Sequence, residues 1–166
     1  METLEQEFLS AFESHADAIF RYCYVRLGER ERAKDATQET FCRTWAWLAS
    51  GKRAQNLRAL LYRTAHNLTV DAYRRGRDES LERLVQQGMD APDTSLPDPH
   101  TEIQARQALA LARRLDARYR DPLLMRYVDD LSVKDIAQAI GESENTVSVR
   151  LHRALKQLKD LIQPEL

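Results

Sequence analysis

Apolar side chains in the first half of the chain recur every three or four residues over three stretches, which is the spacing of one helix face. The stretches cover residues 4–27, 30–48 and 57–75, and a glycine closely follows each as a stop signal. Residues 1–77 are therefore predicted to form three helices that share one core. The positions predicted to face this core are Leu4, Phe8, Phe12, Ile19, Cys23 and Leu27, then Ala33, Thr37, Phe41, Trp45 and Leu48, then Leu57, Leu61, Thr64, Leu68 and Ala72.

A change of composition interrupts this pattern. Between residues 78 and 101 the apolar spacing decays, and one glycine and three prolines stand among Asp, Ser and Thr. Such a composition is typical of a linker. Helical spacing then returns over residues 102–166, first along 103–115. A further helix is predicted to open at Asp121-Pro122, because aspartate is a good N-cap and proline suits the first helical position.

The end of the chain predicts a helix-turn-helix. Ser132 can cap a short helix that ends near Ile140, Gly141 can make the turn, and Ser143 can cap a long helix that continues to Ile162. No stretch alternates with the period of a strand. The predicted fold is all-α, with two small helical domains joined by a flexible linker. The inward positions predicted for the long helix are Val147, Leu151, Ala154, Leu158 and Leu161.

Charge is segregated although the net charge is only -1. Residues 52–77 carry seven basic residues and one acidic residue, whereas residues 78–102 carry one basic residue and seven acidic residues. A positive block beside an acidic block indicates local contact with a polyanion. The alternative is a solvated basic helix face, and charge by itself favours that alternative.

The outer face of the long C-terminal helix is suited to a DNA groove. Arg153 and Lys156 can donate to phosphate or guanine, and Ser148 and His152 are short enough to touch base edges. The amides at the start of the helix offer a phosphate seat. An ordinary helical hairpin is the alternative. The complete candidate set is Ser143, Asn145, Thr146, Ser148, Val149, His152, Arg153 and Lys156.

Motifs in both halves resemble one family. Residues 33–45 read AKDATQETFCRTW and closely resemble the region 2.2 signature of extracytoplasmic-function (ECF) sigma factors. Residues 56–75 read NLRALLYRTAHNLTVDAYRR and resemble regions 2.3 and 2.4 of that family. The resemblance continues into region 4 and covers almost the whole chain. Its region 4 positions are Arg126-Tyr127, Leu131-Ser132, Ile136-Ala137, Gly141 and Thr146-Val147.

The resemblance implies a sigma factor that binds core RNA polymerase and directs it to promoters with -10 and -35 elements. It implies region 2 over residues 1–77, an acidic flexible linker over 78–101 and region 4 over 102–166. The expected partners are the β′ clamp helices, the β flap, promoter DNA and an anti-sigma factor. The face implied to bind the clamp helices carries Asp35, Gln38, Glu39 and Arg43.

The third predicted helix is implied to bind the separated strand of the -10 element. Such a surface needs cations for phosphates and hydrogen-bonding groups for an unstacked base. Asn67 falls at the family position associated with a flipped base, and the loop 51–56 before the helix contains no aromatic residue, unlike some relatives. The residues expected to bind this element are Gln55, Arg63, Asn67, Arg74, Arg75 and Arg77.

Region 4 departs from the family pattern, including in its last helix. Many relatives continue Gly-Thr-Val with Lys or Arg and then Ser, whereas this chain has Ser148 and Val149. One cation is absent at Ser148, and Val149 can contact a thymine methyl group. We therefore expect the -35 sequence read by this helix to differ from those of better-known relatives.

Two other classes of function are alternatives to a sigma factor. A free-standing helix-turn-helix regulator would need an effector pocket or a self-association face in residues 1–77. A metal-dependent nuclease could use Glu39, His66 and Asp71, but neither paired-carboxylate spacing nor a glycine-rich phosphate loop occurs. The sequence therefore predicts no enzyme activity, no metal and no cofactor.

The remaining predictions concern the two cysteines and the cellular location. Cys23 and Cys42 both fall inside helical patterns, which predicts two buried free thiols. The apolar runs are too short to cross a bilayer, so no membrane insertion is expected. The acidic start of the chain lacks the order of a signal peptide, which predicts a cytoplasmic protein.

Overall fold

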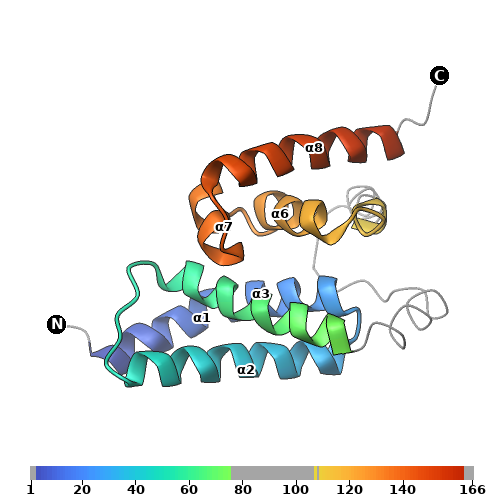
Figure 1. Ribbon diagram of the computed structural model, residues 1–166. Helices are drawn as coiled ribbons and strands as arrows, with labels where there is room; N and C mark the ends of the chain where they lie inside the picture. The colour runs from blue at the N-terminus through green and yellow to red at the C-terminus, as the bar shows by residue number, and fades with distance from the viewer. Residues whose placement is uncertain (1–2, 76–106, 108, 163–166) are drawn as a thin grey trace. The chain divides into compact units, whose positions relative to one another are not determined.

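The computed structural model describes residues 3–75, 107 and 109–162, which are helical apart from caps and turns and contain no β-strand (Figure 1). The all-α prediction is confirmed. The chain divides into two compact units. The predicted linker and Arg77 lie outside the described residues. The helices of the first unit are α1 (Leu4–Leu27), α2 (Arg30–Ala49) and α3 (Leu57–Arg75), and those that follow are α6 (Ala117–Tyr127), α7 (Val133–Ile140) and α8 (Glu144–Ile162).

Helix α1 has a specific signal at each end. The hydroxyl of Thr3 accepts a hydrogen bond from the Gln6 N–H at 3.2 Å, and the Gln6 side chain accepts from the Thr3 N–H at 3.0 Å. This reciprocal capping box satisfies two amides that the helix leaves without partners. Gly28 ends the helix with a φ of 72°, a left-handed conformation that glycine adopts without steric cost.

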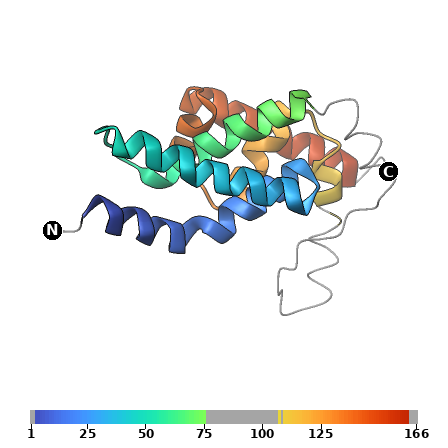
Figure 2. The same ribbon diagram turned by 90° about the horizontal axis from the view of Figure 1, so that it is seen from below.

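Helices α1, α2 and α3 pack against one another in all three pairs (Figure 1, Figure 2). Aromatic rings join α1 to α2, since the buried Phe41 ring lies 4.9 Å from Phe12 and 6.1 Å from Phe8, both edge-on. Trp45 adds a contact with Phe8 at 5.1 Å. Edge-to-face rings of this kind contribute beyond the area they bury. The aromatic residues of the motif at 33–45 thus hold the bundle together.

The buried stripe of α3 is rotated from the predicted one. Leu61 is buried as expected, but Leu57, Thr64, Leu68 and Ala72 are only half-buried. Tyr62 is absent from the predicted core positions, whereas its ring is fully buried and meets Tyr22 of α1 edge-on at 5.4 Å. Alanines on either side allow close approach. The buried residues of α3 are Ala59, Leu61, Tyr62, Ala65 and Thr69.

Three residues that were predicted to be buried in the first unit are exposed. Leu4, the first residue of α1, and Phe12 retain 38% and 45% of their surface. Cys23 is buried as predicted, but Cys42 is exposed. Successive residues of a helix point about 100° apart. With Phe41 facing the core, Cys42 faces out.

In the second unit, α6 begins five residues earlier than predicted. Asp116 is the N-cap, and its carboxylate accepts from the Arg118 N–H at 3.1 Å. The predicted start at Asp121-Pro122 is wrong, since both residues are buried inside the helix. Proline there removes one backbone hydrogen bond, so the cap at Asp116 decides the start against that local cost.

The helix-turn-helix is confirmed over α7 and α8. The hydroxyl of Ser132 accepts from the Asp135 N–H at 3.1 Å and caps α7, which ends at Gly141 with a φ of 72°. Ser143 caps α8 by accepting from the Thr146 N–H at 3.1 Å. The predicted inward positions Val147, Leu151 and Ala154 are buried, while Leu158 and Leu161 are half-buried.

Candidate nucleic-acid and protein interfaces

The outer face of α2 carries the four polar residues that the motif singled out. Asp35, Gln38, Glu39 and Arg43 are all exposed. They lie on the side opposite Phe41, which anchors the helix to α1. A carboxylate oxygen of Glu39 lies 2.7 Å from Nε of Arg43, one turn further along. The face therefore offers carboxylates, an amide and a guanidinium to a partner, two of them already paired.

Cys42 belongs to the same face of α2, which the sequence interpretation did not anticipate. It lies one helical turn from Gln38 and Glu39, with its thiol open to solvent. The polar residues Gln38 and Glu39 were the available signal, because residues three and four positions before Cys42 in a helix share a face with it. The thiol offers a chemical reporter within a candidate interface.

The outer face of α3 presents cations on both sides of one amide. Arg63, Asn67 and Arg74 are exposed at steps that keep them on one side of the helix, and Arg75 is exposed beside them. Asp71 is also exposed between Asn67 and Arg74. A track of phosphates along this face would therefore be attracted at its two ends and repelled near Asp71.

The neighbouring inward face of α3 holds a polar contact with α1. The hydroxyl of Tyr22 lies 3.1 Å from Nδ1 of His66, and the Arg26 guanidinium lies 3.2 Å from the centre of the Tyr22 ring. Within residues 3–75, 107 and 109–162, no three His, Cys, Asp or Glu side chains are grouped so that they could hold a metal ion, and Glu39, His66 and Asp71 of the nuclease alternative are among those residues. In α1, burial lowers the pKa of His15, and the guanidinium of Arg58 at the start of α3 lowers it further.

The loop between α2 and α3 contributes the exposed side chain of Gln55. Asn56 ends the loop by accepting from the Ala59 N–H at 3.1 Å, which caps α3. The loop itself has no aromatic residue, but the Lys52 ammonium lies 5.8 Å from the ring centre of Trp47 in α2. An aromatic ring thus lies beside the loop although none lies within it.

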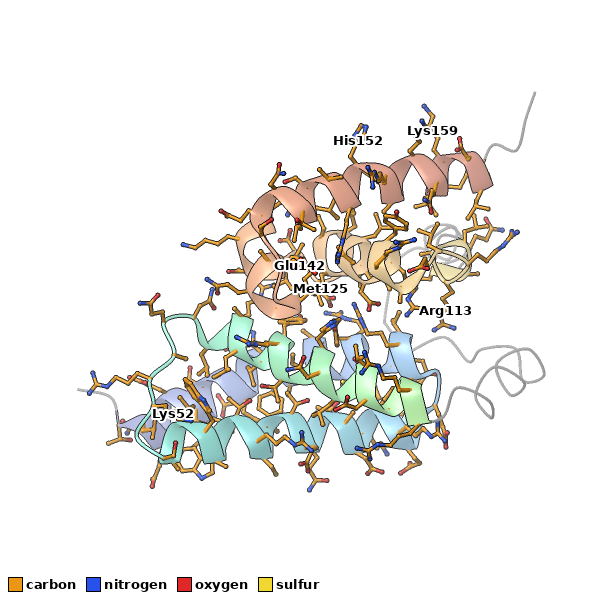
Figure 3. All side chains as sticks on the ribbon, in the orientation of Figure 1. Lys52, Arg113, Met125, Glu142, His152 and Lys159 are labelled. Atoms are coloured by element: carbon orange, nitrogen blue, oxygen red, sulfur yellow. The ribbon has the colours of Figure 1, made fainter. Side chains whose placement is uncertain are left out.

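The predicted reading face of α8 is exposed along its length. Burial of Val147 and Leu151 turns the opposite side to solvent, and Figure 3 shows His152 and Lys159 projecting away from the rest of their unit. Val149 keeps 40% of its surface exposed. The exposed residues of this face are Asn145, Ser148, Val149, His152, Arg153 and Lys156.

Two hydroxyls at the start of α8 are already organised. Ser143 accepts from the Thr146 N–H and donates to the Thr146 hydroxyl at 2.9 Å. A hydroxyl has one donor and two acceptor positions. Ser143 is therefore committed to the helix cap, whereas the Thr146 hydroxyl keeps its own hydrogen for another acceptor such as a phosphate.

Arg150 is a charged residue near this face that sequence reasoning missed. Its Nη2 lies 3.3 Å from a carboxylate oxygen of Glu142 in the turn. The pair spans eight residues, which is longer than the three- or four-residue spacing that a helix pattern reveals. The opposite charges on either side of the Ser143 cap were the only signal.

Family models match both halves of the chain. The model for Sigma-70 region 2 matches residues 11–79, and that for Sigma-70, region 4 matches residues 105–158. The ECF RNA polymerase sigma factor SigW of Bacillus subtilis is 28% identical over an alignment of 171 positions, which covers 95% of this chain and 91% of SigW. SigL of Mycobacterium tuberculosis, another ECF sigma factor, is 30% identical over 154 residues, which cover 92% of this chain and 86% of SigL.

This chain belongs to the ECF RNA polymerase sigma factors. The sigma factor binds core RNA polymerase and promoter DNA, directs promoter-specific initiation of transcription and is not an enzyme. Its membership favours this function over a free-standing helix-turn-helix regulator. None of the helices within the described residues is long and apolar enough to cross a membrane.

Solved structures agree on the fold. The sigma factor RpoE from Bartonella quintana, determined in complex with the anti-sigma factor NepR, superposes with a TM-score of 0.72 at 21% identity. The superposition covers 96% of this chain and 99% of that chain. CnrH, determined with the cytosolic domain of CnrY, gives the same score at 18% identity and covers 98% of this chain and 91% of that one.

Proposed function

We propose that this sigma factor uses three separate exposed faces: α2 for core polymerase, α3 with the preceding loop for the -10 element, and α8 for the -35 element. The observation that supports this division is that the polar residues at the motif positions of all three helices point to solvent, while the apolar residues beside them are packed. Surfaces built in this way can be occupied at the same time, because each uses a different helix.

The α2 face is proposed to bind the β′ clamp helices through Asp35, Gln38, Glu39 and Arg43. The pair between Glu39 and Arg43 is exposed, and such pairs contribute only about 0–1 kcal/mol. Exchanging it for hydrogen bonds to a partner therefore costs little. The unit that contains α8 is proposed to contact the β flap, which rests on the family resemblance.

The α3 face is proposed to hold the separated strand of the -10 element. Arg63 and Arg74 would each attract a phosphate, and the negative Asp71 between them would favour a base over a phosphate at the middle of the track. Asn67 lies beside Asp71 and can donate to and accept from the edge of an unstacked base. Gln55, Arg75 and Arg77 would extend the same surface.

The α8 face is proposed to lie in the major groove of the -35 element. Arg153 can meet both acceptors of one guanine, Val149 can meet a thymine methyl group, and Asn145, Ser148 and His152 can reach neighbouring base edges. Thr146 and the amides near Ser143 would hold a phosphate. Lys156 lies one turn beyond His152, where a straight helix leaves the groove.

An anti-sigma factor is proposed as a further partner, and the cytoplasm as the location. Among proteins of the same fold, the sigma factor RpoE was determined with the anti-sigma factor NepR, and CnrH with the cytosolic domain of CnrY. A protein that works on polymerase and chromosomal DNA has to be present where both of them are.

Reversal of charge on α2 is expected to weaken binding to core polymerase. The variant Asp35→Lys/Glu39→Lys should lose affinity for core polymerase, because two negatively charged hydrogen-bond acceptors are replaced by positively charged donors. Substitutions at exposed sites change stability by only about 0.5 kcal/mol, so the bundle should stay folded. Fluorescence of Trp45 and Trp47, both in α2, checks the folding, and Glu5→Lys/Glu13→Lys on α1 is the control of equal charge.

Alkylation of Cys42 reports on the same contact in the wild-type chain. Core polymerase should slow its alkylation, as measured by mass spectrometry of the peptides, while the buried Cys23 stays unreactive with or without polymerase. An alkylation rate at Cys42 that is indifferent to polymerase, together with undiminished affinity of the double variant, would remove α2 from the interface.

Loss of the Asn67 side chain is expected to affect strand opening rather than -35 binding. Asn67→Ala should reduce the number of permanganate-reactive thymines in the promoter complex while leaving affinity for an isolated -35 duplex unchanged. Arg63→Ala is the matched neighbour and should weaken all -10 sequences alike, because a phosphate contact carries no sequence information. Normal opening with Asn67→Ala would exclude Asn67 from the -10 site.

Arg153 and Lys156 are expected to contribute differently to -35 recognition. Arg153→Ala should cost about 1–3 kcal/mol at one base position and relax the preference there. Lys156→Ala should weaken every sequence and reduce the salt slope by about one. Selection from a randomised -35 pool followed by salt titration separates the two. Wild-type preferences in Arg153→Ala with altered ones in Lys156→Ala would mean that α8 lies rotated in the groove.

A further inference from the structure

The turn before α8 is joined to the side of that helix by an ion pair. Nη2 of Arg150 lies 3.3 Å from a carboxylate oxygen of Glu142, and the two side chains are 26% and 39% exposed. Glu142 is the residue between Gly141, which ends α7, and Ser143, which caps α8. The pair therefore connects the centre of the turn to the second turn of the recognition helix.

Arg150 occupies the border between the packed and the exposed sides of α8. Its neighbours Val147, Leu151 and Ala154 are buried, whereas Arg153 is exposed. From this border a guanidinium can reach back to the turn or outward to a phosphate. Its guanidinium bonds to the carboxylate of Glu142, so in the free protein it reaches back.

We propose that Glu142 and Arg150 are positioning residues that fix the turn against α8 and so set how the first residues of that helix meet the -35 bases. This inference rests on the proposed role of α8. The other fixed points of the turn are local: Gly141 in the left-handed conformation and the Ser143 cap. The ion pair adds a longer connection, because it joins the turn to a residue beyond the first turn of the helix.

Charge alone predicts the opposite sign for Glu142. A carboxylate beside the N-terminus of a DNA-binding helix repels phosphates, so its removal should strengthen binding to every sequence. A positioning role predicts weaker and less selective binding when the same carboxylate is removed. The sign of the change therefore separates the two explanations.

The test compares Glu142→Gln with Glu144→Gln, a matched loss of an exposed carboxylate two residues away. Glu142→Gln should bind the best -35 duplex about two- to fivefold more weakly, the range that a partly exposed ion pair supports. Its base preferences should flatten at the positions read by Asn145 and Ser148. Glu144→Gln should bind equally well or more tightly. Tighter binding by Glu142→Gln would overturn the proposal.

Reversal of the pair provides the rescue. Glu142→Arg should lose base preference, and the double variant Glu142→Arg/Arg150→Glu should recover most of it because the pair can reform with the same net charge. A double variant no better than the single one contradicts the proposal. So does a salt slope that falls by about one in Arg150→Gln, since Arg150 would then be a phosphate ligand.

A measurement on the protein without DNA distinguishes an error in the positioning role of the ion pair from an error in the assignment of α8 to the -35 element. Hydrogen exchange of the Thr146 and Val147 amides, which bond to Ser143, should be faster in Glu142→Gln than in Glu144→Gln. Unchanged exchange would overturn the positioning role even if α8 reads DNA. If the amides exchange faster in Glu142→Gln but the wild-type protein binds no -35 duplex, the positioning role of the ion pair stands and the proposed reading face of α8 is rejected.

Discussion

Burial of Val147, Leu151 and Ala154 fixes the rotation of α8 about its axis, and the proposed recognition of the -35 element depends on that rotation. A helix has about 3.6 residues per turn, so a fixed inward stripe determines every outward side chain. The caps at Ser132 and Ser143 then set where α7 and α8 begin. Packing and capping thus act together to turn a sequence of polar residues into an ordered reading surface.

The same constraint operates in the first unit with aromatic side chains. Phe41 is held between Phe8 and Phe12, which leaves Asp35, Gln38 and Glu39 on the outside of α2. Tyr62 is held against Tyr22, which leaves Arg63 and Asn67 on the outside of α3. In each helix a buried residue stands close in sequence to the exposed residues whose direction it sets. Core substitutions should therefore redirect binding faces as well as reduce stability.

The sequence could predict the helices and their ends because those signals are local. Gly28 and Gly141 mark helix ends, and Ser132 and Ser143 mark starts, each through chemistry within four residues. The family motifs likewise identified faces that the structure leaves exposed.

Features that depend on contacts between distant residues could not be predicted in the same way. The rotation of α3 follows from Tyr62 meeting Tyr22, and the pair between Glu142 and Arg150 crosses a turn. The exposure of Cys42 and the start of α6 at Asp116 had local signals, but they were outweighed by a general preference for buried thiols and by the aspartate–proline pair at 121–122. Which bases each face reads depends on DNA contacts that no local signal encodes.

The most direct test of the central claim is transcription in vitro by core polymerase on a genomic library, with and without the chain, followed by mapping of start sites. The account predicts start sites that occur only when the chain is present and that share two upstream elements at a constant spacing, one for each DNA-binding face. Start sites that are unchanged by the chain, or chain-dependent start sites without shared upstream elements, would contradict it.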